Sequence, residues 1–330
     1  MQYRKFGNTE LMVSEIGFGA WAIGGNAQVG ATPIGWGEVD DDVSRKAIKA
    51  AMEAGINFFD TADFYGLGHS EQILGEVLKN NNSIMIATKV GHRNIDEKIV
   101  VDYSREYIIK ACEESLKRLK RDVIDYYQLH SARIQHLQNG ECIDAMKTLK
   151  KQGKIRYWGL SLNTFYPETE AAYLMEKNSG DGFQLVFNLI NQKAIDIIKE
   201  ASRKGYGIIA RMPLQFGLLT GKFSVHTKFR NDDHRSFRLT PEIIDHTLKV
   251  LEDKVWPIAT TEQLTKTQLA LSFILSFKEI STIIPGIRTP EHVVQNTAGL
   301  KSLKEENTEV LQSLAQTDWK EIMTLMEKQG

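Results

Sequence analysis

The feature of this chain that most restricts its fold is a regular alternation of short apolar runs with longer segments of helical spacing. The runs are rich in β-branched and aromatic residues and occupy 16–21, 56–60, 84–89, 124–130, 155–161, 183–188, 207–211 and 280–285. The helix candidates that follow them occupy 42–54, 70–79, 104–120, 136–152, 168–178, 193–205, 267–277 and 290–300. Strands that alternate with helices form a parallel sheet, and eight such units are the number that closes a (β/α)8 TIM barrel.

Two further segments fall outside the eight units. Residues 3–15 predict a β-hairpin ahead of the first strand, and 305–326 predict an extra C-terminal helix. Long connections follow the first strand (22–40) and the seventh (213–240), and loops of such length in a compact domain are usually functional. Because the chain has no low-complexity tract and no Pro/Ser linker, we expect residues 1–330 to form a single α/β barrel domain.

Charge and composition exclude several classes of function. The 330 residues include 41 basic and 42 acidic side chains, and a net charge of -1 gives no electrostatic footprint for nucleic acid or an anionic membrane. Cys112 and Cys142 suit neither a disulfide framework nor a zinc site, so we expect no metal. Neither a transmembrane run nor a signal peptide is visible, which favours a cytoplasmic protein that acts on a small molecule.

Polar residues end three successive strands of the predicted barrel, where active sites of such barrels form. Asp60 ends the second strand, Lys89 the third and His130 the fourth, and Tyr65 follows Asp60 closely. A tyrosine has a pKa near ~10 and needs a neighbouring cation to stabilise its anion. A buried ammonium in turn needs a carboxylate. Each residue alone has a structural explanation, but the four together favour proton transfer, with the histidine orienting a carbonyl oxygen.

The motifs around these residues resemble the aldo-keto reductase signature. They are Phe-Asp-Thr-Ala-Asp-Phe-Tyr-Gly at 59–66, Ser-Glu-Gln-Ile-Leu-Gly at 70–75, Thr-Lys at 88–89, Leu-His at 129–130, Gly-Leu-Ser-Leu-Asn at 159–163, Gly-Leu-Leu-Thr-Gly-Lys at 217–222 and Ile-Pro-Gly at 284–286. The resemblance runs in order from the hairpin to about residue 300. It implies a (β/α)8 oxidoreductase dependent on NAD(P)(H), with Tyr65 as proton donor, Lys89 and Asp60 as its tuning pair, and His130 as the residue that positions the carbonyl.

The sequence also indicates where a dinucleotide would bind. Gly17 and Gly19 begin a Rossmann fingerprint, but the next glycine, Gly24, comes too late, so the run indicates a close-packed first strand. Phosphate groups are expected to bind after strands seven and eight instead. The segment 214–222 supplies backbone N–H groups and a cation for a pyrophosphate through Leu214, Gly217, Thr220 and Lys222.

After strand eight, Gly286 leads into a helix that we expect Thr289 to cap and Pro290 to begin, so its N-terminus points into the mouth of the barrel. Arg288 suits the 2′-phosphate that distinguishes NADPH from NADH.

The resemblance further implies that Ser161, Asn163 and Gln184 hold the carboxamide and that Gln295 and Asn296 meet the adenosine. Two positions depart from the family pattern. Arg211 replaces an aromatic residue that stacks on the nicotinamide in many relatives, although a guanidinium can also lie flat on a ring. His292 occupies a position that is often Arg or Gln. The preference for NADPH then rests mainly on Arg288, and we expect NADPH as cofactor, with NADH possible.

The substrate pocket is expected to have aromatic walls, which suit carbonyl compounds: Trp21, Trp36 and Phe64. The charge-dense segment 226–238 predicts a mobile solvated lid, with a phosphosubstrate site as the alternative.

The leading hypothesis is reversible, NADPH-dependent reduction of an aldehyde or ketone to an alcohol. One alternative is an NADPH-binding, redox-sensing regulatory subunit with little turnover. Another is an aldolase that forms a Schiff base on Lys89, which Asp60 would oppose by keeping the lysine charged. The substrate, the favoured direction and the oligomeric state stay open, because a fold does not settle them.

Overall fold

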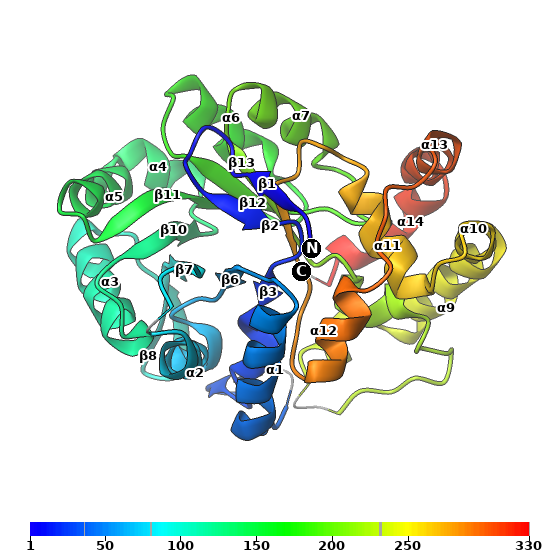
Figure 1. Ribbon diagram of the computed structural model, residues 1–330, viewed down its shortest axis with the longest axis horizontal. Coiled ribbons are helices and arrows are strands. Elements are labelled where there is room, and N and C mark those ends of the chain that lie inside the picture. Colours follow the sequence, from blue (N-terminus) through cyan, green and yellow to red (C-terminus); the bar gives the residue numbers. More distant parts are fainter. Residues whose placement is uncertain (36, 80, 231–232, 330) are drawn as a thin grey trace.

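The computed structural model describes residues 1–35, 37–79, 81–230 and 233–329. These residues form an eight-stranded parallel sheet in the order β14-β13-β12-β11-β10-β7-β6-β3 (Figure 1). Its strands are β3 (Phe18–Gly19), β6 (Phe58–Asp60), β7 (Met85–Val90), β10 (Ile124–His130), β11 (Ile155–Ser161), β12 (Gly182–Val186), β13 (Gly207–Arg211) and β14 (Thr282–Ile284). Bridges from Ile16 to Ile283 and from Gly19 to Gly286 join the first strand to the last, which confirms the predicted barrel.

The line along which the barrel closes depends on small residues in the first strand. A Cβ atom at Gly19 would lie 2.8 Å from the carbonyl oxygen of Pro285, and one at Gly17 would lie 3.0 Å from that of Phe58. At Gly19 no other residue fits without a backbone shift, and at Gly17 a Cβ atom would force its neighbours to give way slightly. Gly19 therefore lies in a close-packed first strand, as predicted, and Gly17 lies immediately before it, with its N–H donating to the carbonyl oxygen of Ile283.

Helices surround the barrel, and α1 packs against α12 so that the ring of helices also closes (Figure 1). In α3, Ser104 accepts a hydrogen bond from the backbone N–H of Tyr107 and caps the helix, and the apolar face of Ile108, Cys112, Leu116 and Leu119 is buried. The helices of the repeating units are α1 (Asp41–Glu53), α2 (His69–Leu78), α3 (Arg105–Leu119), α4 (Ile134–Asn139), α5 (Glu141–Lys151), α6 (Glu168–Glu176), α7 (Ile195–Arg203), α11 (Lys266–Leu275) and α12 (Pro290–Thr297).

Two predicted helices are each divided in the structure. The segment 136–152 is split into α4 and α5 at Gly140, whose φ of 87° no continuous helix accommodates. The C-terminal segment holds α13 (Glu305–Ser313), the 3₁₀ turn η5 (Leu314–Gln316) and α14 (Asp318–Glu327), because Thr317 leaves the helical conformation with φ -118° and ψ -89°. The C-terminal extension is thus helical, but it consists of two helices.

The N-terminal hairpin of β1 (Tyr3–Lys5) and β2 (Met12–Ser14) lies across one end of the barrel (Figure 1). Phe6, in its turn, is fully buried and packs with Phe58 and Tyr126 in an apolar cluster at the amino ends of the strands. Gly182 and Gly207 make room for its ring, since a Cβ atom at either position would come within 2.8 Å of it. The hairpin therefore closes the barrel on the side opposite the expected active site.

The connections contain elements that the sequence did not predict. A second hairpin of β8 (His92–Ile95) and β9 (Lys98–Val101) follows β7 directly. Other connections contain further elements, namely η1 (Ala20–Ile23), β4 (Gln28–Val29), β5 (Thr32–Pro33), η2 (Tyr65–Gly68), η3 (Gln215–Thr220), α8 (Arg235–Arg238), α9 (Pro241–Val250), the π-helical turn η4 (Leu251–Val255) and α10 (Trp256–Thr261). The connection after β13 is thus largely folded.

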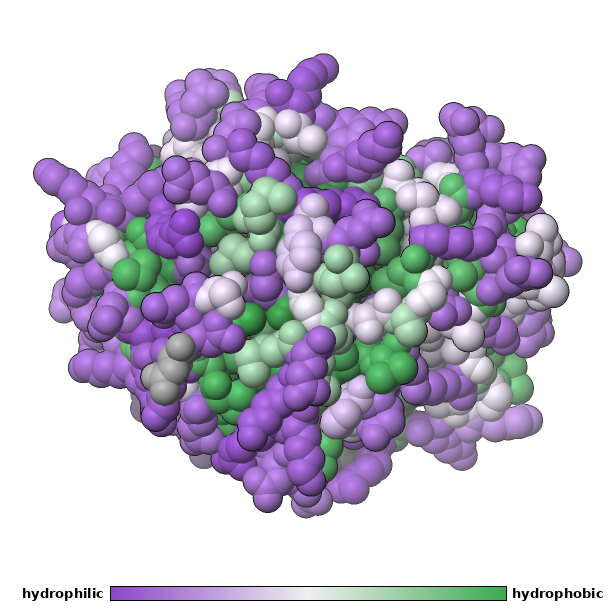
Figure 2. Space-filling model, in the orientation of Figure 1, coloured by the Kyte–Doolittle hydropathy of each residue, from purple (hydrophilic) through white to green (hydrophobic). Residues whose placement is uncertain are grey.

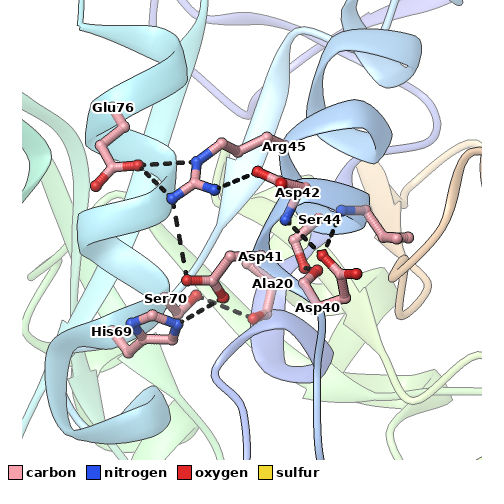
Figure 3. A network of polar contacts seen from close by, with 10 residues as sticks. Ala20, Asp40, Asp41, Asp42, Ser44, Arg45, His69, Ser70 and Glu76 are labelled. Carbon is pink, nitrogen blue, oxygen red and sulfur yellow. Dashed lines mark hydrogen bonds and ion pairs between the residues drawn. The ribbon is translucent and has the colours of Figure 1, made fainter.

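A polar network joins the first two helices and supports the turn beside the mouth of the barrel (Figure 3). Arg45 of α1 forms ion pairs with Asp42 on the same helix and with Glu76 of α2, and His69 contacts Asp41 across the same gap. The Ser70 hydroxyl donates to the carbonyl oxygen of Ala20 in η1. These contacts fix η1, the turn that carries Trp21, against α2.

The face of the molecule drawn in Figure 2 is mostly polar, as expected for helices whose apolar faces pack inward. In the view of Figure 2, hydrophilic residues cover most of the visible face, with smaller apolar areas between them. Among the described residues, none of the helices combines the length and the apolar character that crossing a membrane requires.

Candidate active site

The carboxyl ends of the strands surround a pocket of about 500 Å³. Asp60 at the end of β6, His130 at the end of β10 and Tyr65 in η2 line it. Lys89 of β7 lies directly behind Tyr65 and is fully buried. Because β6, β7 and β10 are neighbours in the barrel, the sheet brings together the four residues predicted to act as one group.

The ammonium group of Lys89 is held by three acceptors. Its Nζ donates to Oδ1 of Asp60 at 2.5 Å, to the carbonyl oxygen of Thr61 at 2.8 Å and to Oη of Tyr65 at 3.2 Å. An ammonium has three N–H donors, so this set leaves none unsatisfied. The arrangement places a cation directly on the tyrosine hydroxyl.

The other carboxylate oxygen of Asp60 is also fully engaged. Its Oδ2 accepts hydrogen bonds from Nε2 of Gln128 at 3.0 Å and of Gln184 at 2.7 Å. A buried ion pair needs such additional partners to offset the loss of hydration. Gln184, which the sequence assigned to the cofactor carboxamide, thus lines the pocket while its side-chain amide N–H groups support the carboxylate. Gln128 was not predicted.

Burial and the neighbouring charges determine the protonation of the pair. Burial alone lowers the pKa of Lys89, but Asp60 and Tyr65 outweigh it, and the pKa ends above its usual value. Burial raises the pKa of Tyr65, and Lys89 only partly opposes the rise. At neutral pH the pair is therefore an ammonium beside a neutral phenol, which is ready to donate a proton. A charged lysine lacks the free amine that a Schiff base requires, which counts against the aldolase alternative.

His130 lies beside the tyrosine as a neutral imidazole. Burial, reinforced by the nearby His92, Lys89 and Arg211, holds the pKa of His130 well below its usual value. The ring meets Tyr65 edge to face, with centroids 5.9 Å apart, and meets His92 in the same way at 4.6 Å. A neutral imidazole carries one N–H donor, so it can bind and orient a carbonyl oxygen next to Tyr65. His92, which belongs to the unpredicted hairpin, is a neighbour that the sequence did not reveal.

The same pocket is lined by most of the residues that were predicted to bind a cofactor. They are Ser161, Gln184, Arg211, Leu214, Gly217, Thr220, Lys222, Gly286, His292, Gln295 and Asn296. Thr289 caps α12 and Pro290 is its first residue, as predicted, so the helix begins beside the pocket.

Two predicted cofactor contacts lie elsewhere. The Asn163 side chain accepts hydrogen bonds from the backbone N–H groups of Phe165 and Tyr166, at 3.0 and 2.9 Å, and closes a turn instead of lining the pocket. Arg288 is also outside the lining, and its backbone N–H donates to Nδ1 of His292 at 3.3 Å. The charge of Arg288 nevertheless affects a pocket residue. It contributes, after burial and Lys222, to the lowered pKa of His292.

The predicted aromatic walls are only partly present. Trp21 lines the pocket and meets the ring of Tyr65 edge to face at 4.7 Å. Phe64 is turned away from it, packing with Val29 and Ile34 and against His92, because the 3₁₀ turn directs adjacent residues to different sides. As a wall of this pocket, Phe64 was the wrong assignment. Trp36 lies outside the described residues.

The charge-dense segment 226–238 contributes directly to the pocket rather than lying wholly in solvent. His234, Arg235 and Arg238 line it, and Asp233 forms a two-pronged ion pair with Arg235, whose shortest contact is 2.6 Å. Of the two alternatives weighed from the sequence, a solvated lid does not describe this part of the segment.

The backbone just after β13 adopts conformations that side chains rarely tolerate. Met212, Gln215 and Phe216 have φ values of 55°, 43° and 56°, and all three line the pocket. Asn188 holds two of them, since its Nδ2 donates to the carbonyl oxygen of Met212 at 2.9 Å and to Oε1 of Gln215 at 2.8 Å. Backbone strain of this kind persists only where the surroundings enforce it, and it concentrates at functional sites.

Several lining residues escaped the sequence reasoning. Ser131 and Thr164 follow strand ends, so a wider search of those ends would have found them. Phe223, Thr267 and Met326 come from distant parts of the chain and carry no local signal.

Comparisons with known proteins agree with this geometry. The model of the aldo/keto reductase family matches residues 15–316. The chain belongs to this family. Aldo/keto reductases are oxidoreductases that generally use nicotinamide cofactors, and their (β/α)8 fold is the one observed.

Three similar proteins illustrate the range of the family. The chain is 29% identical to the uncharacterized oxidoreductase YqkF of Bacillus subtilis, covering 96% of this chain and 98% of that one. It is 26% identical to a probable voltage-gated potassium channel subunit beta of Oryza sativa, covering 95% of both chains. The solved structure of the glycerol dehydrogenase AKR11B4 from Gluconobacter oxydans is 28% identical with a TM-score of 0.80, covering 96% of this chain and 95% of the other.

Proposed function

We propose that this aldo/keto reductase is an NADPH-preferring enzyme that reduces an aldehyde or ketone to an alcohol and catalyses the reverse oxidation. One observation carries the proposal: Lys89 Nζ contacts both the Asp60 carboxylate and the Tyr65 hydroxyl at the mouth of the barrel. A neutral His130 beside them supplies the donor that a carbonyl oxygen needs. Acid, cation and hydrogen-bond donor thus converge on one point.

The remaining pocket residues fit a phosphorylated dinucleotide. Burial is the main cause that lowers the pKa of His292, and the charge of the nearby Lys222 lowers it further. Lys222 therefore makes this end of the pocket cationic. A helix N-terminus capped by Thr289 adds a partial positive charge. We assign this end to the 2′-phosphate and adenosine, together with Gln295 and Asn296. Arg288 adds charge there without lining the pocket.

The rest of the cofactor is assigned along the strand ends. Leu214, Gly217 and Thr220 would hold the pyrophosphate, with Gly286 allowing close approach. Ser161 and Gln184 would hold the carboxamide, and Arg211 would face the nicotinamide ring.

Each residue of the tetrad has one task in the proposed reaction. When bound, the reduced nicotinamide supplies a hydride for the carbonyl carbon. Tyr65 donates the proton of its Oη to the carbonyl oxygen, and Lys89 stabilises the phenolate that this leaves. Asp60 keeps Lys89 charged, and His130 orients the carbonyl oxygen towards Tyr65.

Titration with NADPH and, separately, NADH tests the cofactor assignment through quenching of tryptophan fluorescence, since Trp21 lines the pocket. We expect tighter binding of NADPH and loss of that preference in Lys222→Met. Oxidation of NADPH in the presence of a panel of aldehydes then tests turnover. Equal binding of the two nucleotides would contradict the NADPH assignment, and binding of neither would contradict the reductase proposal.

A second candidate is a cofactor-binding regulatory subunit with little turnover. Similarity to a probable potassium channel subunit beta over 95% of both chains favours it. It predicts tight NADPH binding without carbonyl-dependent NADPH oxidation, together with a stable complex with another protein. Turnover that depends on Tyr65 would decide for the reductase.

A further inference from the structure

Two arginines in the pocket lack the carboxylate partners that arginines usually have. Arg211 donates to the carbonyl oxygen of Leu162, to the Thr164 hydroxyl and to the sulfur of Met212, and its Nε is buried without a partner. The Nε of Arg238 donates to Nε2 of His234 at 3.0 Å. Within the described part of the chain, neither guanidinium forms an ion pair with a carboxylate.

Both arginines lie on the Tyr65 side of the pocket. Arg211 is close enough to Tyr65 to oppose the rise in its pKa. Arg238 is linked to Tyr65 by successive side-chain contacts. It is hydrogen-bonded to His234, the ring centroids of His234 and Trp21 are 5.9 Å apart, and those of Trp21 and Tyr65 are 4.7 Å apart. Burial, and to a smaller extent the positive charge of Arg238, lowers the pKa of Arg211, so the two guanidiniums are close enough to interact unfavourably. Lys222 is a separate cation, assigned above to the cofactor phosphate, and burial together with its charge lowers the pKa of His292.

Like charges that are partly removed from water are costly unless an anion compensates them. The only carboxylate among the described pocket-lining residues is that of Asp60, which favours the charged form of Arg211 but is already paired with Lys89 and accepts hydrogen bonds from Gln128 and Gln184. A bound anion would therefore supply charge that the pocket itself does not provide for both arginines. Guanidinium groups match carboxylates and phosphates because their N–H donors form a planar fork.

We propose that Arg211 and Arg238 bind an anionic group of the substrate, so that the enzyme prefers aldehydes or ketones that carry a carboxylate or a phosphate. The inference rests on the proposed reductase function. The pyrophosphate of the cofactor is the other source of the same chemistry, and it is distinguished by its effect on nucleotide affinity.

The test compares matched substrates with the full chain and NADPH: succinic semialdehyde against its amide, and glyceraldehyde phosphate against glyceraldehyde. We expect kcat/KM for the anion to exceed that for the neutral partner at least ~10-fold, the size of a charge-assisted hydrogen bond. Arg238→Met should bring this ratio close to one, mainly through KM, and Arg238→Lys should restore part of it. Lys249→Met, on the exposed side of α9, should leave the ratio at the wild-type value.

Other outcomes would overturn the inference. Equal kcat/KM values for neutral and anionic substrates would overturn the anion site and leave the proposed reductase function intact. If Arg238→Met weakened NADPH binding and left the substrate ratio unchanged, the arginines would belong to the pyrophosphate. If no carbonyl were reduced, the proposed function would fail, and succinate binding to the NADP⁺-loaded protein, measured by calorimetry, would decide the anion site. Binding weakened by Arg238→Met supports the site, and no binding overturns it.

Discussion

The two ends of the barrel are built on the same eight strands but have opposite character. At the amino ends, Phe6 is fully buried and its ring lies 4.9 Å from Tyr126 in a cluster of apolar side chains. At the carboxyl ends, the equally buried Asp60 and Lys89 are charged, and the backbone after β13 is strained. One end is packed as a core usually is, and the other holds groups that cores usually exclude.

This difference indicates a division of labour along the strands. Apolar packing of the hairpin stabilises the barrel without involving the pocket, so the opposite end can hold buried charges and unfavourable φ values. Substitutions at the amino end should therefore change stability and leave chemistry intact. Substitutions at the carboxyl end should affect chemistry most.

The largest effect is expected for Lys89→Met. Turnover should fall by ~10²–10⁴, because Tyr65 loses the cation that stabilises its anion. The free energy of unfolding should also fall by about 3 kcal/mol, since Asp60 is left buried without its counter-charge. Steady-state kinetics and urea unfolding measure the two effects.

The matched control is the double variant Asp60→Asn with Lys89→Met, which removes both charges. It should recover much of the lost stability while staying inactive, because the ion pair is needed for chemistry more than for folding. Lys89→Met with near-normal turnover would contradict the role assigned to the lysine.

Phe6→Ala should lower stability and leave turnover intact, unlike Lys89→Met. Loss of the fully buried ring should lower the free energy of unfolding by about 3–5 kcal/mol and leave kcat of the folded enzyme close to wild type. Met12→Ala in the same hairpin, at a side chain that is 49% exposed, should change stability by less than about 0.5 kcal/mol. A large drop in kcat for Phe6→Ala would show that the two ends are not independent.

Acid should destabilise the carboxyl end. Burial, together with the charge of Arg238, lowers the pKa of His234 from 6.5 to about 4. As the pH falls, the histidine is therefore protonated in the unfolded chain before it is protonated in the folded one. The free energy of unfolding keeps its full value above pH 6.5 and falls by up to about 3 kcal/mol as the pH drops towards 4. Unfolding in urea across this range should show a weaker pH dependence in His234→Gln. The control is His226→Gln, at an exposed side chain, whose stability should depend on pH as in the wild type. A wild-type pH dependence of stability in His234→Gln would contradict this account.

Much of the barrel could be predicted because its strands are continuous apolar runs. The bounds of β10, β11 and β13 coincide with the predicted runs, since each is mostly buried and ends at a polar residue. The hairpin β8–β9 was missed because its turn, Asp96–Glu97, takes left-handed φ values of 48° and 60° without the asparagine or glycine that usually marks such turns. His92 was missed with it.

The candidate site was predictable where its residues end strands or lie in short motifs. Strand order alone brings Asp60, Lys89 and His130 together. Side-chain direction within a turn was not predictable, so Phe64 was expected in the pocket beside Tyr65. Arg238 and Met326 reach the pocket through long-range packing, which leaves no periodic signal in the sequence.

The most direct test of the central claim, that Tyr65 is the proton donor of this barrel, is the turnover of Tyr65→Phe with NADPH and an accepted aldehyde. We expect kcat to fall by at least ~10²-fold while the affinity for NADPH stays near wild type, because only the hydroxyl is lost. Tyr166→Phe, at a side chain that is 60% exposed, provides the matched control and should keep full activity. A Tyr65→Phe enzyme that retained most of its kcat would contradict the account.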